Sequence, residues 1–300
     1  MDKHNPHGFG AVEQANADAL IALAVAEDMG AEGDVTSRAT IPADAEGLGI
    51  FVARAPGVLA GLPVVGKLAA EFGIDDGWLG YLVDGAPLAA GSRIGRLEGP
   101  MRSILAMERI ALNFLQRLSG IATLTAQFVD RVAGTKAAIL DTRKTTPGWR
   151  ALEKYAVRCG GGRNHRMGLY DAVLIKDNHL AWLGHDPDPI GRAIEAARRL
   201  APGAKFLEVE VDSLDQFDRA LAFGAEIILL DNFGANDLRE AVRRRDAAGS
   251  PALLEASGGI TLETVADLAA SGVDRISVGA LTHSAPALDI GLDEGRVEVS

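Results

Sequence analysis

The sequence predicts an α/β protein in which an incomplete α/β barrel follows a smaller α+β unit. After residue 135, short runs of aliphatic and β-branched residues alternate with helical patterns, which is typical of a parallel sheet with crossover helices. A polar or charged residue lies at the end of nearly every run, where barrel enzymes carry their chemistry, whereas an open sheet would gather such residues at one switch point. Only about 165 residues remain for a barrel that needs ~250 when complete, so we expect it to be incomplete.

The first 120 residues contain short elements separated by Gly and Pro turns. The pattern predicts a helix at residues 17–27 and strands at 50–55, 58–60 and 94–97. The most apolar stretch near the start, residues 19–26, is bounded by acidic residues, which argues against a signal peptide and a membrane span.

Residues 101–130 have the clearest helical pattern of the chain. One face is apolar at helical spacing and carries Met107, Ile110, Ala111, Phe114, Leu118 and Ile121. Arg109, Asn113 and Gln116 fall together on another side, and a solvated polar stripe is the simplest interpretation of them.

The expected barrel strands are residues 137–141, 172–176, 206–211, 226–231, 252–256 and 275–278. Between them, helical patterns include residues 190–200, 214–223 and 262–270. The polar or small residues at the strand ends are Asp141, Lys176, Glu208 with Glu210, Asp231, Ser257 and Gly279.

Charge is distributed unevenly along the chain. The net charge of −11 argues against nucleic acid or an anionic membrane as a partner. Residues 143–179 nevertheless hold eight Lys and Arg against three Asp and Glu, so we expect a small anion to bind there. The single cysteine, Cys159, has no partner for an intrachain disulfide, which suits a cytoplasmic protein.

Two loops carry several of these cations. In the first, Arg143 and Lys144 follow a buried strand, and they offer a planar fork and a compact charge to carboxylate or phosphate. In the second, three glycines precede His165 and Arg166; consecutive glycines cost entropy, which a closely approaching ligand would explain. A solvated loop is the alternative in both cases.

Lys176 ends an apolar strand, and two functional interpretations of it stay open. It is either a fixed cation for an anionic substrate or a desolvated Schiff-base amine. The carboxylates Glu208, Glu210 and Asp231 end neighbouring strands, and such a cluster suits Mg²⁺, which takes one or two carboxylates together with waters and phosphates. Alternatively, these acids pair with barrel lysines.

The last two strand ends are rich in small residues. Residues 257–261 lead from a strand into a helix, and residues 278–283 repeat a small-residue opening. In barrels, phosphate often binds at the last two of these loops. Together the rim predicts a phosphorylated, metal-bound sugar donor and a second, strongly anionic acceptor.

The chain resembles the quinolinate phosphoribosyltransferases. The resemblance runs from about residue 20 to 290 and is carried by segments 33–37, 108–123, 141–179, 230–232, 255–260 and 279–284. It implies an N-terminal α/β sandwich-like domain, residues 1–118 completed by 285–300, and a seven-stranded incomplete α/β barrel, residues 119–284. It further implies a glycosyltransferase of NAD biosynthesis that converts quinolinate and phosphoribosyl pyrophosphate to nicotinate mononucleotide, pyrophosphate and CO₂.

Site residues follow from the same resemblance. The residues implied for quinolinate are Arg109, Arg143, His165, Arg166 and Lys176, with Arg109 reaching in from the neighbouring subunit of a homodimer or higher oligomer. Catalytic roles are implied for Lys144, Glu210 and Asp231, with Mg²⁺ held by the two carboxylates directly or through water. Phosphoribosyl pyrophosphate is implied to bind Lys144, Ser257, Gly258, Gly259 and Gly279. The segment 184–189 looks like an insertion in a connecting loop.

Other functions are compatible with the same fold and the same residues. A relative associated with molybdenum transport, or one specific for nicotinate, would use another acceptor. A lyase would form a Schiff base on Lys176. A sensor would bind phosphoribosyl pyrophosphate without turning it over.

Overall fold

The computed structural model describes residues 7–184 and 186–295, which fold into two compact units. Unit 1 consists of the residues up to 126 together with 145–161 and those from 281 onward. Unit 2 consists of residues 127–144 and 162–280. The two units interleave along the chain, and the domain limits expected at 118/119 and 284/285 stay a prediction.

Unit 1 is built on a four-stranded antiparallel sheet with the order β12-β1-β5-β3. Its strands are β1 (Glu46–Ala53), β3 (Trp78–Gly80), β5 (Arg93–Pro100) and β12 (Ile290–Gly295). A separate two-stranded sheet pairs β2 (Gly57–Val58) with β4 (Pro87–Leu88). The strands β1, β2 and β5 overlap the three expected strands. The C-terminal segment returns to this unit as β12, as the resemblance implies. Of the segment 285–300 expected to complete the unit, residues 296–300 lie outside the described residues.

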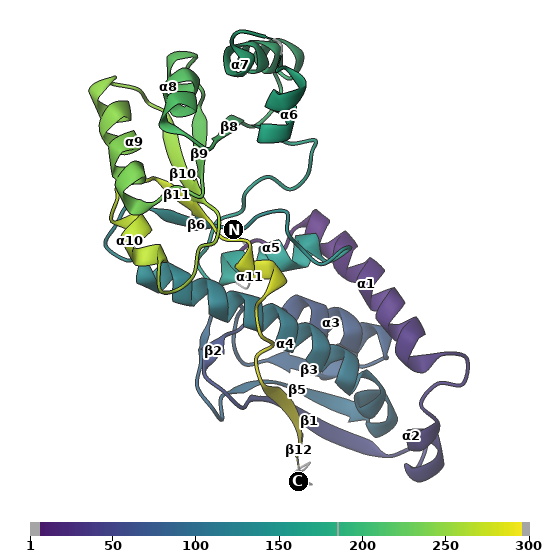
Figure 1. Cartoon of the computed structure of the whole chain (residues 1–300). Coiled ribbons are helices and arrows are strands. Elements are labelled where there is room, and N and C mark those ends of the chain that lie inside the picture. Colours follow the sequence, from purple (N-terminus) through teal and green to yellow (C-terminus); the bar gives the residue numbers. More distant parts are fainter. Residues whose placement is uncertain (1–6, 185, 296–300) are drawn as a thin grey trace. The chain divides into compact units, whose positions relative to one another are not determined.

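The helices of unit 1 pack on and around this sheet. They are α1 (Ala11–Met29), α2 (Val35–Thr40), α3 (Leu62–Glu71), the short 3-10 turn η1 (Asp75–Gly77), α4 (Met101–Arg131), most of it in this unit, and α5 (Arg150–Cys159). Figure 1 shows the long α4 beside the strands β1 and β5. Ile104 of α4 reaches Gly49 of β1, where a Cβ would lie 3.2 Å from its Cγ2. The apolar face predicted for this helix is buried throughout.

A glycine allows the returning C-terminal segment to cross α4. A Cβ on Gly120 would lie 2.0 Å from the carbonyl oxygen of Pro286, so no larger residue fits at this position. Beside the crossing, the Leu288 N–H donates to the Gln116 carbonyl, and the Gln116 amide donates to the Ile290 carbonyl at 2.7 Å. Gln116 is therefore not part of a solvated stripe, whereas Arg109 and Asn113 are exposed.

Unit 2 is a parallel sheet covered by helices, as the alternating pattern predicts. The strand order is β6-β11-β10-β9-β8-β7, and every pair is parallel. The strands are β6 (Ala138–Leu140), β7 (Val173–Ile175), β8 (Leu207–Val211), β9 (Ile227–Asp231), β10 (Leu253–Ser257) and β11 (Arg275–Ser277). Each lies within one of the expected runs or extends it by one residue.

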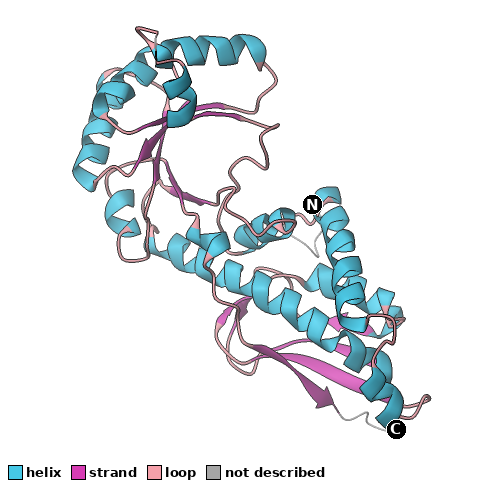
Figure 2. Ribbon diagram, turned by 45° about the vertical axis from the view of Figure 1, so that its right-hand side comes forward, coloured by secondary structure: helices cyan, strands magenta, loops and turns pink. Residues whose placement is uncertain are grey.

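Helices follow the strands and lie outside them in Figures 1 and 2. They are α6 (Asp177–Trp182), α7 (Pro189–Leu200), α8 (Leu214–Ala222), α9 (Ala235–Ala247) and α10 (Val265–Ala269), and α11 (Ala280–His283) comes after β11. The expected insertion at 184–189 connects α6 to α7, and its residue 185 lies outside the described residues.

The number of strands differs in detail from the seven implied by the resemblance. In the part of the chain that the structure describes, six strands form this sheet, and a single parallel bridge between Leu140 and Arg163 occupies the place beside β6. The Asp141 N–H donates to the Arg163 carbonyl, and the Arg163 N–H donates to the Ile139 carbonyl. The segment in the seventh position therefore pairs with β6 through a single bridge. The three glycines before Arg163 do not continue the pairing.

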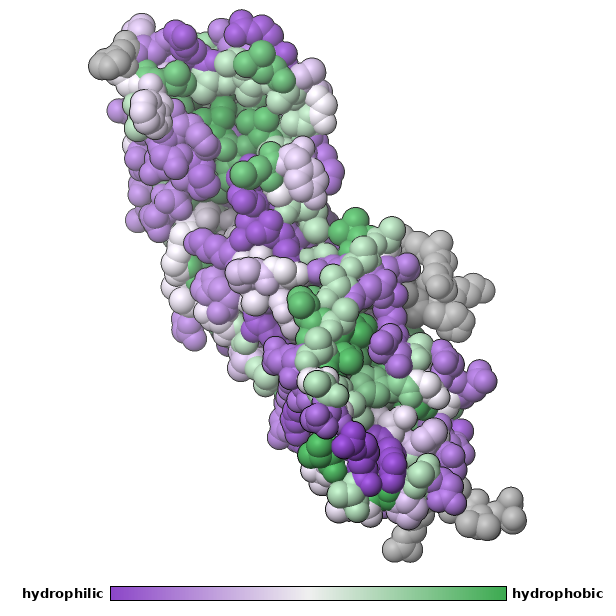
Figure 3. All heavy atoms as spheres, turned by 90° about the vertical axis from the view of Figure 1, so that its right-hand side faces the viewer, coloured by the Kyte–Doolittle hydropathy of each residue, from purple (hydrophilic) through white to green (hydrophobic). Residues whose placement is uncertain are grey.

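The surface shown in Figure 3 mixes hydrophilic areas with hydrophobic patches. Among the described residues, we find no helix with the length and apolar character that crossing a membrane requires.

Candidate functional site

The carboxyl ends of β9 and β10 bring two predicted site residues together. The parallel register places Asp231 opposite Ser257. The next residue, Asn232, donates its backbone N–H to the Ser257 carbonyl at 2.8 Å and its side-chain amide to Asp231 at 2.7 Å. Asn232 has a φ of 58°, the only positive value at a non-glycine residue in the described chain. This left-handed turn orients the Asp231 carboxylate.

Gly258 closes the same corner. Its φ is +98°, and a Cβ there would lie 2.1 Å from Oδ1 of Asn232. Glycine is therefore required both by the backbone conformation and by the close approach. Gly259 follows with a φ of +57°, and a Cβ there would meet no heavy atom within 4 Å. Gly279 ends the neighbouring segment after β11 and leads into α11.

Lys176 and Glu210 form an ion pair across β7 and β8. The register that pairs Ile175 with Val209 also places the following residues, Lys176 and Glu210, side by side. The Lys176 side chain is 39% exposed and that of Glu210 is 12% exposed, so the pair lies at the surface of the strand ends. Pairing of Glu210 with a lysine of the barrel is the alternative that the sequence left open for these acids.

The cation-rich loops carry the guanidinium groups of Arg143 and Arg166, and the charge of the first acts on the second. Arg166 is 8% exposed and donates to the Ala172 carbonyl at 3.2 Å. Burial, and then the positive charge of Arg143, lower the pKa of Arg166. Nε of Arg143 is buried without a hydrogen-bond partner among the described residues. Two like charges that influence each other, one of them with an unused donor, are a favourable place for an anion with several oxygens.

The His165 ring lies beside two buried carboxylates. Its Nε2 is 2.9 Å from Oε2 of Glu208 and 3.5 Å from Oε1 of Glu255, and both glutamates are fully buried. Nε of Arg275 lies 2.7 Å from Oε2 of Glu255. Burial raises the pKa of Glu208 to about 7 and, together with the charge of Glu208, raises that of Glu255 to about 7.

The sequence pattern placed Glu208 with Glu210 and Asp231 in one acidic cluster. Side-chain alternation does bring Glu208 and Glu210 to the same side of β8, but their partners differ: Glu208 meets His165, and Glu210 meets Lys176. Glu255 was missed as a member of this arrangement. Its signal in the sequence was a charged residue in the middle of an apolar strand.

The remaining predicted residues are Lys144 and Arg109. Lys144 is exposed in unit 2, in the loop after β6, where its backbone N–H donates to the Thr142 hydroxyl at 3.0 Å. Arg109 is exposed on α4 in unit 1. The other predicted residues, from Arg143 to Gly279, all belong to unit 2.

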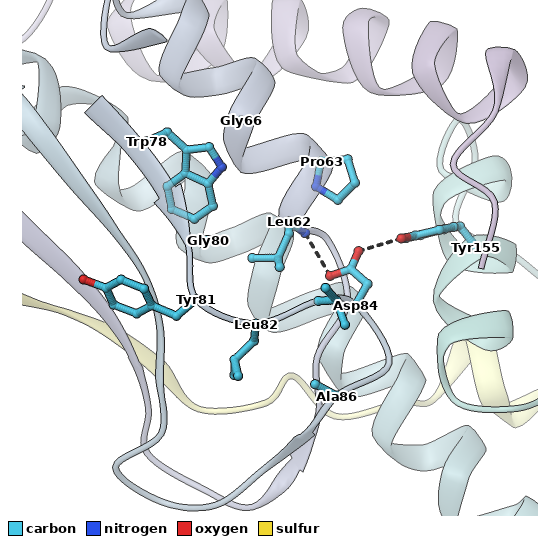
Figure 4. A pocket seen from close by; sticks show the side chains of 11 residues that line it. Leu62, Pro63, Gly66, Trp78, Gly80, Tyr81, Leu82, Asp84, Ala86 and Tyr155 are labelled. Atoms are coloured by element: carbon cyan, nitrogen blue, oxygen red, sulfur yellow. Dashed lines mark hydrogen bonds between the residues drawn. The ribbon is translucent and has the colours of Figure 1, made fainter. Parts of the chain in front are cut away.

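Unit 1 has a cavity of about 560 Å³ that no sequence pattern predicted. Figure 4 shows Trp78, Tyr81 and Leu82 among its lining side chains, with Asp84 and Tyr155 at one end. Asp84 accepts hydrogen bonds from the Tyr155 hydroxyl at 2.6 Å and from two N–H groups at the start of α3. Burial raises the pKa of Asp84. These donors engage both carboxylate oxygens, so Asp84 joins α5 to α3.

The parallel α/β sheet, with cations, carboxylates and glycine turns at its carboxyl ends, defines the class of barrel enzymes that act on phosphorylated, anionic substrates. Residues 34–119 match the family described as quinolinate phosphoribosyl transferase, N-terminal domain, and residues 121–293 match its C-terminal domain. The chain belongs to the quinolinate phosphoribosyltransferase family.

Individual relatives agree with this assignment. A nicotinate-nucleotide pyrophosphorylase [carboxylating] of Mycobacterium leprae is 50% identical over 275 residues, which cover 91% of this chain and 95% of the relative. A probable enzyme of the same name from Bacillus subtilis is 41% identical over 270 residues, which cover 89% of this chain and 89% of the relative. The solved structure of the nicotinate-nucleotide pyrophosphorylase from Francisella tularensis is 38% identical, covers 94% of this chain and 96% of that one, and has a TM-score of 0.86.

Proposed function

We propose that the chain transfers the phosphoribosyl group of phosphoribosyl pyrophosphate to quinolinate with loss of CO₂, giving nicotinate mononucleotide and pyrophosphate in de novo NAD biosynthesis. Membership of the family supports the reaction. The acceptor is supported by two arginines of the cation-rich loops: Arg166 is buried, and Nε of Arg143 is buried without a hydrogen-bond partner among the described residues. Quinolinate presents two carboxylates on adjacent ring atoms, which such donors suit.

Quinolinate is held by cations of the two loops and the strand end beside them. Arg143 and Arg166 supply forked donors and Lys176 supplies a point charge. His165 belongs to the same set. Arg109 completes the set from the neighbouring subunit of a homodimer, an arrangement supported by its exposure on α4.

Phosphoribosyl pyrophosphate is held by Lys144 and by the glycine turns. Ser257, Gly258, Gly259 and Gly279 surround its 5-phosphate with backbone N–H groups, which the open space at Gly259 supports. Glu210 and Asp231 end neighbouring strands and offer the hard oxygen ligands that Mg²⁺ prefers. When bound there, Mg²⁺ neutralises charge on the pyrophosphate leaving group.

The residues act mainly by positioning and electrostatics. As pyrophosphate leaves, the ribose becomes cationic, and the carboxylates at the strand ends stabilise that charge. The pyridine nitrogen then bonds to the ribose, and the resulting ring cation stabilises the electron pair that stays on the ring carbon when the adjacent carboxylate departs as CO₂. That carbon then takes up one proton from water, which gives nicotinate mononucleotide. The arginines orient the ring for this attack. Little proton transfer is needed, so we assign no general base.

The assignment is tested with purified protein, isotopically labelled quinolinate, phosphoribosyl pyrophosphate and Mg²⁺ in the cytoplasmic pH range. We expect release of labelled CO₂ and formation of nicotinate mononucleotide, both lost without Mg²⁺. Turnover of nicotinate but not quinolinate would reject the proposed acceptor, and binding of the donor without turnover would reject catalysis.

A further inference from the structure

Asp141 is a buried carboxylate at the start of the first cation-rich loop. It directly follows β6, it is 0% exposed, and Arg143 comes two residues later. A buried carboxylate needs hydrogen-bond donors, because its removal from water is otherwise costly. Asp141 receives such donors from the second cation-rich loop.

Two consecutive residues of the second loop donate to this carboxylate. The backbone N–H of His165 donates to Oδ1 of Asp141 at 2.9 Å, and the side-chain amide of Asn164 donates to Oδ2 at 2.6 Å. The backbone of Asp141 adds a further contact, because its N–H donates to the Arg163 carbonyl at 3.1 Å. Residues 163–165 are therefore attached one after another to the end of β6.

The sequence of the second loop does not fix its own course. Residues 160–162 are three glycines, and glycine has the greatest backbone freedom of all residues. In the described chain, the sheet continues there by the single bridge between Leu140 and Arg163. The hydrogen bonds to Asp141 therefore decide where the residues after this bridge lie.

Arg166 follows His165 directly, so its backbone is placed by the same contacts. Arg166 is 8% exposed, and its guanidinium donates to the Ala172 carbonyl at 3.2 Å. Burial, and then the charge of Arg143, lower the pKa of Arg166, so the two guanidinium groups are close enough to act on each other. One carboxylate thus lies where it sets the spacing of both arginines.

We propose that Asp141 is a positioning residue for the acceptor, which fastens the second loop to the first so that Arg143 and Arg166 keep the spacing that two adjacent carboxylates require. The proposal rests on the proposed function for the identity of the acceptor. It uses the backbone N–H of His165 and leaves the ring to contact quinolinate. In this role Asp141 contacts the second loop and not the substrate.

Asn164 allows one of the two side-chain bonds to be removed without changing the first loop. Asn164→Ala should raise KM for quinolinate about two- to tenfold, the range that one hydrogen bond contributes, and leave KM for phosphoribosyl pyrophosphate within about twofold. The matched control is Asn236→Ala, which removes an exposed amide of α9 that accepts from Arg239 at 2.7 Å. It should change neither KM. Thermal denaturation of each variant checks that the fold is kept.

Exchanging the two side chains tests the pair itself. Asn164→Asp alone sets two carboxylates against each other, so it should raise KM for quinolinate more than Asn164→Ala does. Adding Asp141→Asn restores one amide donor and one carboxylate acceptor, and the carbonyl of the new amide still accepts from the His165 N–H. The double variant should therefore return KM for quinolinate to within about threefold of the unsubstituted protein.

Hydrogen exchange followed by NMR measures the other bond without any substrate. We expect the backbone N–H of His165 to exchange slowly in the unsubstituted protein and in the double variant. In Asp141→Ala, its exchange should be at least about tenfold faster, because the acceptor is lost. The Phe217 N–H, which donates to the Ser213 carbonyl at 2.9 Å in α8, is the control and should keep its rate.

The outcomes separate positioning from a merely structural role. Equal rises of both KM values in Asn164→Ala, or a lower melting temperature with an unchanged KM for quinolinate, would make the contact structural and overturn the proposal. A double variant no better than Asn164→Asp, or a His165 exchange rate unaffected by Asp141→Ala, also overturns it. If the unsubstituted protein does not turn over quinolinate, the proposed function fails, and the exchange rates still decide whether Asp141 fixes the second loop.

Discussion

Among single residues, Arg166 gives the most direct test of the anion site. Arg166→Ala removes a buried fork and should weaken quinolinate binding by about 2–5 kcal/mol, with a much smaller effect on phosphoribosyl pyrophosphate. Calorimetric titration of each substrate measures both. Arg192→Ala, at an exposed arginine of α7, is the matched control. Equal losses for the two substrates would rule out a specific contact with the acceptor.

Asn232 is the second residue with a distinct expectation, because its left-handed backbone is costly for most side chains. Asn232→Gly should keep the turn, whereas Asn232→Ala should be less stable than Asn232→Gly by about 1 kcal/mol. Both lose the amide contact with Asp231, so both should bind phosphoribosyl pyrophosphate more weakly. Chemical denaturation and substrate titration check the two parts. A glycine variant less stable than the alanine variant would contradict this account of the turn.

At the scale of secondary-structure elements, the proposed Mg²⁺ would bind carboxylates at the ends of two neighbouring strands, β8 and β9. Changing Glu210 and Asp231 together to Gln and Asn keeps their size and removes the charge, so Mg²⁺-dependent turnover should disappear. Quinolinate binding should stay within a few fold. Glu195→Gln with Asp215→Asn, both exposed, provides the control for lost charge. Near-normal activity of the Glu210 and Asp231 double variant would mean that these acids are structural.

The contact between α5 and the start of α3 should matter for stability. Tyr155→Phe removes the hydroxyl that donates to the buried Asp84 and should lower the free energy of unfolding by about 1–3 kcal/mol. Tyr170→Phe is the matched control, since Tyr170 is 84% exposed. Urea denaturation measures both. If the two substitutions have the same effect, the hydrogen bond contributes nothing to stability.

At the scale of the whole molecule, the expected homodimer allows a test by complementation between two inactive variants. If Arg109 serves the neighbouring subunit, inactive Arg109→Ala and inactive Lys144→Ala should complement each other when subunits exchange. Half of randomly formed dimers are mixed, and each has one intact site, so roughly a quarter of the unsubstituted activity should return. Exchange is verified by mass spectrometry of tagged subunits. No recovery despite exchange would place Arg109 in its own subunit's site or in none.

Much of the fold could be predicted because it depends on local periodicity. Alternation of strand and helix patterns predicted the parallel sheet of unit 2, and the apolar spacing of residues 101–130 predicted α4. The polar residues at strand ends predicted that Asp231 and Ser257 would lie together, since parallel strands end at one edge. Short elements such as β3 and β4 carry too few residues for a period to be recognised, and sheet pairing over long distances stabilises them.

The pairing within the site could not be predicted, because it depends on register and on the depth of each side chain in the sheet. Alternation gave Glu208 and Glu210 the same direction, but the neighbouring strands give one a histidine and the other a lysine. The spacing of Gln116 placed it in a polar stripe, but in the structure its amide donates a hydrogen bond to Ile290 of the returning C-terminal segment. In each case the partner is distant in the sequence, so the hydrogen bond that decides the role exists only once the chain has folded.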